Sequence, residues 1–165
     1  MARGAHSRRL RSGTISAVDT WRDTTSQQAQ DDLDGLLNAV MPIARKTLAK
    51  YGELVPFGAA TLISGRVEII AAYPDEDLDA LTDPQVLEGL KGAARQQASE
   101  SRAVAFIADG LLNGSDALLF DAEHREGVAL KMMVPYTRHR FPRRVTLDHS
   151  QGVLQLGAAQ VWASD

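Results

Sequence analysis

The chain has 165 residues, a formal net charge of −3 and no cysteine. A chain of this length buries about two thirds of its unfolded surface around one core, so a single domain is the default expectation. The absence of cysteine excludes a disulfide framework, cysteine-based zinc sites and thiol nucleophiles.

The sequence predicts no membrane partner. No stretch approaches the roughly 18 to 20 consecutive apolar residues that span a bilayer, and the apolar run 103–108 ends at Asp109. The amino terminus contains arginines but no continuous apolar segment with a cleavage site, as a secretory signal would have. We therefore expect a cytoplasmic location. An arginine-rich, serine-containing start is also typical of organellar targeting peptides, and that alternative stays open.

Residues 1–30 differ in composition from the rest of the chain. They are rich in Ser, Thr, Gln and Arg, and their apolar residues follow no period. Five arginines against Asp19 and Asp23 give this segment a charge of roughly +3, which leaves roughly −6 for the remainder. This contrast predicts a flexible arm over residues 1–30 and a single folded domain over residues 31–165. An acidic domain does not favour nucleic acid as a partner.

A first helix is expected between Asp31 and Gly52. Apolar side chains recur at helical spacing from Leu33 to Tyr51. Asp31 and Asp32 suit the positive end of the dipole of this helix, and Gly52 offers a stop after its last residue. Pro42 lies inside this segment and predicts a kink, because proline cannot donate a helical hydrogen bond.

A second helix is expected after the acidic loop 75–79. Thr82 and Gln85 match a capping box, and Asp83 followed by Pro84 offers the alternative of an aspartate cap with proline in the first turn. Both registers begin the helix at the same place. An apolar stripe follows, which indicates that this helix packs by one face.

The remaining pattern predicts seven strands. The run 103–108 is apolar on both faces, which favours a position inside the sheet. Segments 117–124 and 128–136 alternate between apolar and polar residues and form a hairpin, although Pro135 indicates that the second strand ends there or lies at an edge. We expect the last two segments to form another hairpin. The full set is Phe57–Ile63, Val67–Ala72, Ala103–Ala108, Ala117–His124, Val128–Tyr136, Val145–Asp148 and Val153–Leu156.

These elements follow the order α-β-β-α-β-β-β-β-β, with connections too short for repeated crossovers. The order predicts an α+β fold with two layers. We expect a largely antiparallel sheet of about five to seven strands, with two helices mostly on one face.

The most basic segment contains Arg138, Arg140, Arg143 and Arg144 within seven residues. Arginine forks bind phosphate and carboxylate groups, so a small anion is a possible ligand. The simpler interpretation, which we favour, is a solvated loop that pairs with the acidic loop 75–79. Nucleic acid is a poorer match because base stacking needs aromatic side chains, and this segment has only Phe141.

Asp121, Glu123 and His124 are the strongest candidates for chemistry. Two carboxylates and an imidazole could bind a metal ion or share acid and base roles in a hydrolase. Residues of this kind are also expected on the solvated face of a sheet, where Lys131 of the partner strand could pair with either carboxylate. We favour this second interpretation.

No enzyme motif is specific enough to identify a reaction. The phosphate-binding loop, the dinucleotide-binding fingerprint and the HExxH zinc motif are all missing from the sequence, and the sequence leaves any cofactor unknown. The leading hypothesis is a non-catalytic protein-interaction or self-association module that uses the hairpin 57–72 or the apolar stretch 132–134. The alternatives are an anion-binding protein using the basic segment and a hydrolase using the two carboxylates and His124.

Overall fold

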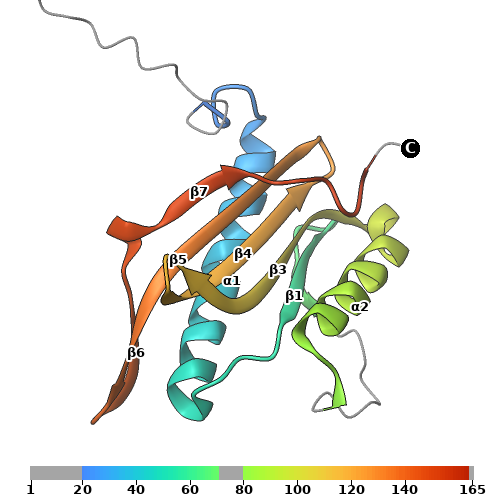
Figure 1. Ribbon diagram of the computed structural model, residues 1–165. Coiled ribbons are helices and arrows are strands. Elements are labelled where there is room, and N and C mark those ends of the chain that lie inside the picture. Colours follow the sequence, from blue (N-terminus) through green and yellow to red (C-terminus); the bar gives the residue numbers. More distant parts are fainter. Residues whose placement is uncertain (1–19, 71–79, 164–165) are drawn as a thin grey trace, which may run out of the picture.

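The computed structural model describes residues 20–70 and 80–163. Two α-helices accompany one curled sheet of antiparallel strands (Figure 1). The helices are α1 (Gln27–Tyr51) and α2 (Asp83–Gln96), and short 3₁₀ turns occupy Ala98–Glu100 and His149–Gln151. The strands are β1 (Phe57–Leu62), β2 (Val67–Ile70), β3 (Ser101–Leu112), β4 (Ser115–His124), β5 (Val128–Arg140), β6 (Arg143–Leu147) and β7 (Val153–Leu156).

The strands lie in the order β2-β1-β3-β4-β5-β6, and β7 also pairs with β5. The predicted α+β class, the order of elements and the antiparallel sheet are confirmed. The last predicted hairpin is wrong. Within the described sheet, β6 pairs with the second half of β5 and β7 with its first half, so the two strands do not pair with each other.

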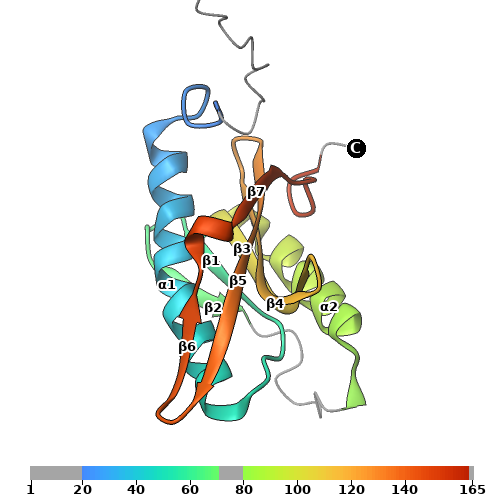
Figure 2. The ribbon, with the colours of Figure 1, turned by 60° about the vertical axis from the view of Figure 1, so that its left-hand side comes forward.

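The two helices lie on opposite faces of the sheet (Figure 2), which corrects the expectation that both lie mostly on one face. The apolar face of α1 packs on a core that includes Ala105 and Ile107, whereas α2 packs on Val104 and Phe106. Successive side chains of a strand point to opposite faces, so β3 supplies both cores. This is why the run 103–108 is apolar throughout, and β3 indeed lies inside the sheet, between β1 and β4.

Helix α1 begins earlier than Asp31. Ser26 caps it by accepting a hydrogen bond from the backbone of Ala29 at 3.1 Å, and Trp21 is buried in the core beneath α1. Residues 20–30, which composition assigns to the arm, therefore pack with the domain. The rest of the predicted arm, residues 1–19, lies outside the described residues. At the other end, Gly52 takes a φ of 74° and its amide bonds to Leu48, as expected for a glycine stop.

The start of α2 combines both predicted signals. The Thr82 hydroxyl accepts a hydrogen bond from the Gln85 backbone at 3.4 Å, and the Gln85 side chain accepts one from the Thr82 backbone at 2.9 Å. Pro84 lies in the first turn. The predicted capping box is confirmed.

Strand β5 continues through Pro135 to Arg140, beyond its predicted end at residue 136. The carbonyl of Pro135 accepts a hydrogen bond from Asp148, on the side of β5 away from β4. The N and C=O groups of one strand residue point to the same side, so the proline nitrogen faces the junction between β6 and β7. Proline is tolerated there because the ladder to β4 needs no donor from it.

Neither α1 nor α2 combines the length and apolar character that crossing a bilayer requires, and the same holds for every helix of the described residues.

The burial of Trp21 gives a test of where the domain begins. We expect Trp21→Ala to lower the free energy of unfolding by about 3 to 5 kcal/mol, because a large aromatic side chain leaves a cavity in the core. Gln28→Ala, in the same segment but exposed, is the matched control and should change it by less than about 0.5 kcal/mol. Urea unfolding measures both. If both substitutions change the free energy of unfolding equally and only slightly, residues 20–30 do not pack with the domain.

Candidate functional site

The four arginines of the basic segment belong to one hairpin, formed by the end of β5 and the start of β6. The hairpin runs alongside the C-terminal half of α1 (Figure 1). An open depression of about 940 Å³ lies between them, and we call it the basic groove. Its lining includes Lys50, Tyr51, Phe141 and the four arginines at 138, 140, 143 and 144. The structure therefore brings all four predicted residues to the tip of one hairpin, where Arg143 faces α1 and its neighbour Arg144 faces the opposite side.

Two of these arginines bind the end of α1. Arg138 donates a hydrogen bond to the carbonyl of Gly52 at 2.5 Å, and Arg143 donates one to the carbonyl of Lys50 at 3.4 Å. The last carbonyls of a helix have no partner within the helix and carry partial negative charge. Arg138 and Arg143 therefore compensate the C-terminal end of α1.

The other two arginines have no such partner. Among the described residues, Arg140 and Arg144 make neither a hydrogen bond nor an ion pair through their side chains. The acidic loop 75–79, which the sequence suggests as their partner, lies outside the described residues. In the described lining of the groove, Asp116 is the single carboxylate. The groove thus has a strong excess of positive charge.

Asp121, Glu123 and His124 do not form one site. Glu123 accepts hydrogen bonds from the backbone of residues 160, 161 and 162, at 2.8 to 2.9 Å, on one face of β4. His124 points to the other face, toward α1. Asp121 lies opposite Lys131 in the β4–β5 register. Asp121 and Glu123 share one face of β4, whereas His124 faces the other way, because adjacent residues of a strand point to opposite faces. The three side chains do not converge, so the hydrolase and metal hypothesis gains no support.

Within the described ranges, no group of three or more histidine or acidic side chains is placed to hold a metal ion. Glu123 instead fastens the C-terminal segment to the sheet. Trp162 adds a hydrogen bond from its indole to the carbonyl of Ala98 at 3.3 Å.

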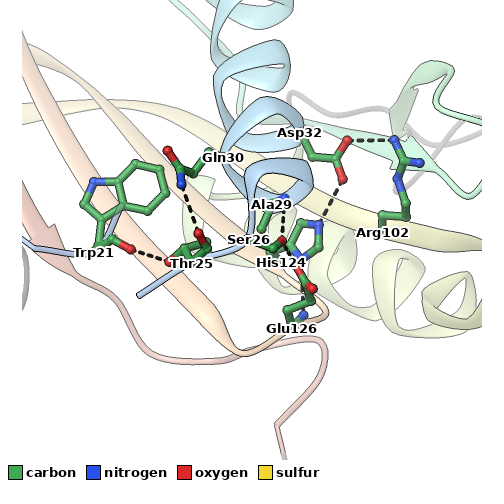
Figure 3. A network of polar contacts seen from close by, with 9 residues as sticks. All are labelled: Trp21, Thr25, Ser26, Ala29, Gln30, Asp32, Arg102, His124 and Glu126. Carbon is green, nitrogen blue, oxygen red and sulfur yellow. Dashed lines mark hydrogen bonds and ion pairs between the residues drawn. The ribbon is translucent and has the colours of Figure 1, made fainter. Parts of the chain in front are cut away.

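A buried polar network connects α1 to the sheet (Figure 3). Asp32 accepts a hydrogen bond from Arg102 at 2.7 Å and contacts Nε2 of His124 at 2.9 Å. The backbone of Glu126 donates to Nδ1 of the same imidazole at 3.2 Å. Because Nδ1 accepts, the proton lies on Nε2 and is donated to Asp32. The side chain of Glu126 also accepts a hydrogen bond from Ser26, the helix cap, at 2.5 Å.

This network is structural. His124 is only 1% exposed and Asp32 is buried, so neither is available to a ligand. Sequence reasoning missed the network because it assigned Asp32 to the helix dipole alone. A signal was present: Asp32 lies four residues before Leu36 and eight before Val40, on the apolar stripe of α1. A carboxylate on such a stripe needs a buried partner.

Tyr136 is a buried residue in the lining of the basic groove. Burial raises the pKa of its phenol above the usual range, and the hydrogen bond to Asp109, at 2.8 Å, raises it further. The negative charges of Asp109 and Asp116 act in the same direction. The phenol is therefore held protonated, as a donor to Asp109.

Compared with known protein families, with curated proteins and with solved structures, the chain has no match.

The buried carboxylate gives a prediction with a matched control. Asp32→Ala should lower the free energy of unfolding by about 3 kcal/mol or more, since it leaves Arg102 partly buried without its counter-ion. Asp34→Ala removes an exposed pair with Arg22 and should cost less than about 1 kcal/mol. Urea unfolding of both variants measures the difference. Similar costs for the two would contradict a structural role for the network.

The raised pKa of Tyr136 predicts how stability depends on alkaline pH. The stabilisation from the protonated phenol is fully present below its ordinary pKa of about 10, and it is lost as the pH rises through the higher folded-state pKa. Because Tyr136 stays protonated in the folded protein in this range, it should contribute no tyrosinate absorbance. The absorbance of the wild type and that of Tyr136→Phe should therefore agree up to about pH 11. Clearly lower tyrosinate absorbance in Tyr136→Phe than in the wild type near pH 10 would contradict the raised pKa of Tyr136.

Proposed function

We propose that this chain is a self-associating interaction module that pairs with a second copy through strand β2. The observation that carries the proposal is the outer side of β2. This strand is the first in the sheet order, so its only strand neighbour in the described sheet is β1. An open sheet edge is a template for a further strand.

The hydrogen-bond pattern of the β1–β2 hairpin identifies the free backbone groups. The amide of Leu62 donates to the carbonyl of Arg66 at 2.8 Å, which makes these two residues a hydrogen-bonded pair. Pairs of this type alternate along an antiparallel ladder, so Glu68 and Ile70 also bond toward β1. Val67 and Ile69 therefore direct their N–H and C=O groups outward.

Two of the exposed side chains on this edge are apolar, and the charged Arg66 and Glu68 lie beside them. Val67 is 36% exposed and Ile69 is 54% exposed, and both lie on the face that α1 covers further along the sheet. Natural proteins protect such edges with charges, prolines or bulges. Two exposed β-branched residues with outward backbone groups are more consistent with an edge that is paired.

The charges beside these residues favour a second copy as the partner. Within one chain, Arg66 already forms an ion pair with Glu68 at 2.5 Å. An antiparallel pair centred on Val67 places Arg66 of one copy opposite Glu68 of the other, so the same charges can also pair between copies. Opposite charges in this position stabilise a sheet, whereas a pair centred on Glu68 would place two carboxylates opposite each other. The edge is therefore complementary to itself in one register, as a twofold dimer requires.

The stretch 132–134, the other apolar segment suggested by the sequence, does not offer an edge. Met132 and Met133 pair with β4 on one side and with β7 on the other. Strand β7 is a second edge and carries exposed Leu154 and Leu156. A substitution on β7 is therefore the control that shows whether β2, rather than β7, forms the pair.

Light scattering during size-exclusion chromatography tests the proposal. The wild type is expected to dimerise, and Ile69→Lys should raise the dissociation constant tenfold or more, about 1.4 kcal/mol, because it places a charge in the shared strand pair. Leu156→Lys on β7 should leave it unchanged. A strict monomer at high concentration, or loss of the dimer in Leu156→Lys alone, would contradict pairing through β2.

A charge swap tests the register. Arg66→Glu should weaken the dimer, because it places two acidic residues opposite each other. The double variant Arg66→Glu with Glu68→Arg should recover it. Failure of the second change to restore the dimer would exclude the register centred on Val67.

A further inference from the structure

We propose that the basic groove binds a nucleotide, that is, a small ligand with several phosphates and a planar ring. This inference does not depend on the pairing of β2, which involves other residues. The first observation is the charge of the groove. Lys50 and four arginines line it, and Asp116 is the single carboxylate among its described residues. Such a concentration of one charge attracts an anion of the opposite sign.

The register of the hairpin places like charges directly opposite each other. Arg140 pairs with Arg143 across the strands, and both side chains point to the face toward α1. Like charges in this position destabilise a hairpin. An anion with several oxygens would bridge the two guanidinium groups and convert this repulsion into bidentate hydrogen bonds.

The end of α1 does not oppose an anion here. The C-terminal carbonyls of a helix would ordinarily repel one. The carbonyls of Gly52 and Lys50 are already bound by Arg138 and Arg143. Each guanidinium has five N–H donors and uses one of them in its hydrogen bond to the helix carbonyl. The two arginines therefore neutralise the helix end and keep donors for a phosphate group.

Aromatic side chains indicate the rest of the ligand. Phe141, at the tip of the hairpin, is 95% exposed, and Tyr51 is also well exposed. Both line the groove beside the arginines. Aromatic rings exposed beside cations are the arrangement that stacks a nucleobase while its phosphates are bound.

The dimensions of the groove favour a small ligand over a polymer. Its volume of about 940 Å³ lies within the range of roughly 300 to 1,000 Å³ typical of small-molecule sites. The folded part of the chain is acidic outside this hairpin, which disfavours a long polyanion that would extend beyond the groove.

Isothermal titration calorimetry of the full chain with adenosine triphosphate tests the proposal. Arg140→Ala should weaken binding tenfold or more, because Arg140 has no structural partner among the described residues. Arg125→Ala removes an equal charge from the exposed β4–β5 turn and should leave the affinity unchanged. The melting temperatures of both variants should match that of the wild type. No binding, or equal losses in both variants, would overturn the site.

Inorganic triphosphate separates the contribution of the ring from that of the phosphates. Phe141→Ala should weaken the nucleotide several-fold and leave inorganic triphosphate unaffected. Equal affinity for both ligands, with no effect of Phe141→Ala, would overturn the nucleotide assignment. So would binding of a single-stranded oligonucleotide, or of vesicles containing anionic phospholipid, without binding of adenosine triphosphate.

Discussion

The fold depends on one constraint: strand β3 has no solvent-facing side over residues 103–108. Its alternate side chains enter two cores, one beneath α1 and one beneath α2. The neighbouring strands share this division, because side chains at paired positions lie on the same face. This division between the two faces of the sheet separates Glu123, which binds the C-terminal segment, from His124, which contacts α1. Glu123 and His124 could act together chemically, but they face opposite sides of the sheet and stabilise different parts of the fold.

Polar contacts hold both ends of α1 against the sheet. At its N-terminal end, Asp32 is buried with Arg102 and His124, so the burial of a carboxylate is compensated by two hydrogen-bond donors. At its C-terminal end, Arg138 and Arg143 bind carbonyls that the helix leaves free. Apolar packing supplies the contact area between these two ends, and the polar contacts select the position of the helix along the sheet.

Two surfaces retain groups that the described fold does not satisfy. Strand β2 has outward backbone groups beside exposed apolar side chains, which suits another strand. The basic groove has arginines without counter-ions beside exposed aromatic rings, which suits a phosphorylated ring compound. The two surfaces differ in chemistry, so an interaction module that also responds to a small ligand is consistent with both.

Local patterns in the sequence determined the elements. The caps of α2, the glycine stop of α1 and the apolar run of β3 depend on neighbouring residues, and the structure has all three. The gathering of four arginines also follows from sequence, since they are close along the chain. Only the tertiary structure decided which face each helix covers, which strand lies at an edge and which charges are compensated. These features depend on contacts between residues far apart in the chain, such as Asp32 with His124 or Arg138 with Gly52, and no local pattern encodes such distances.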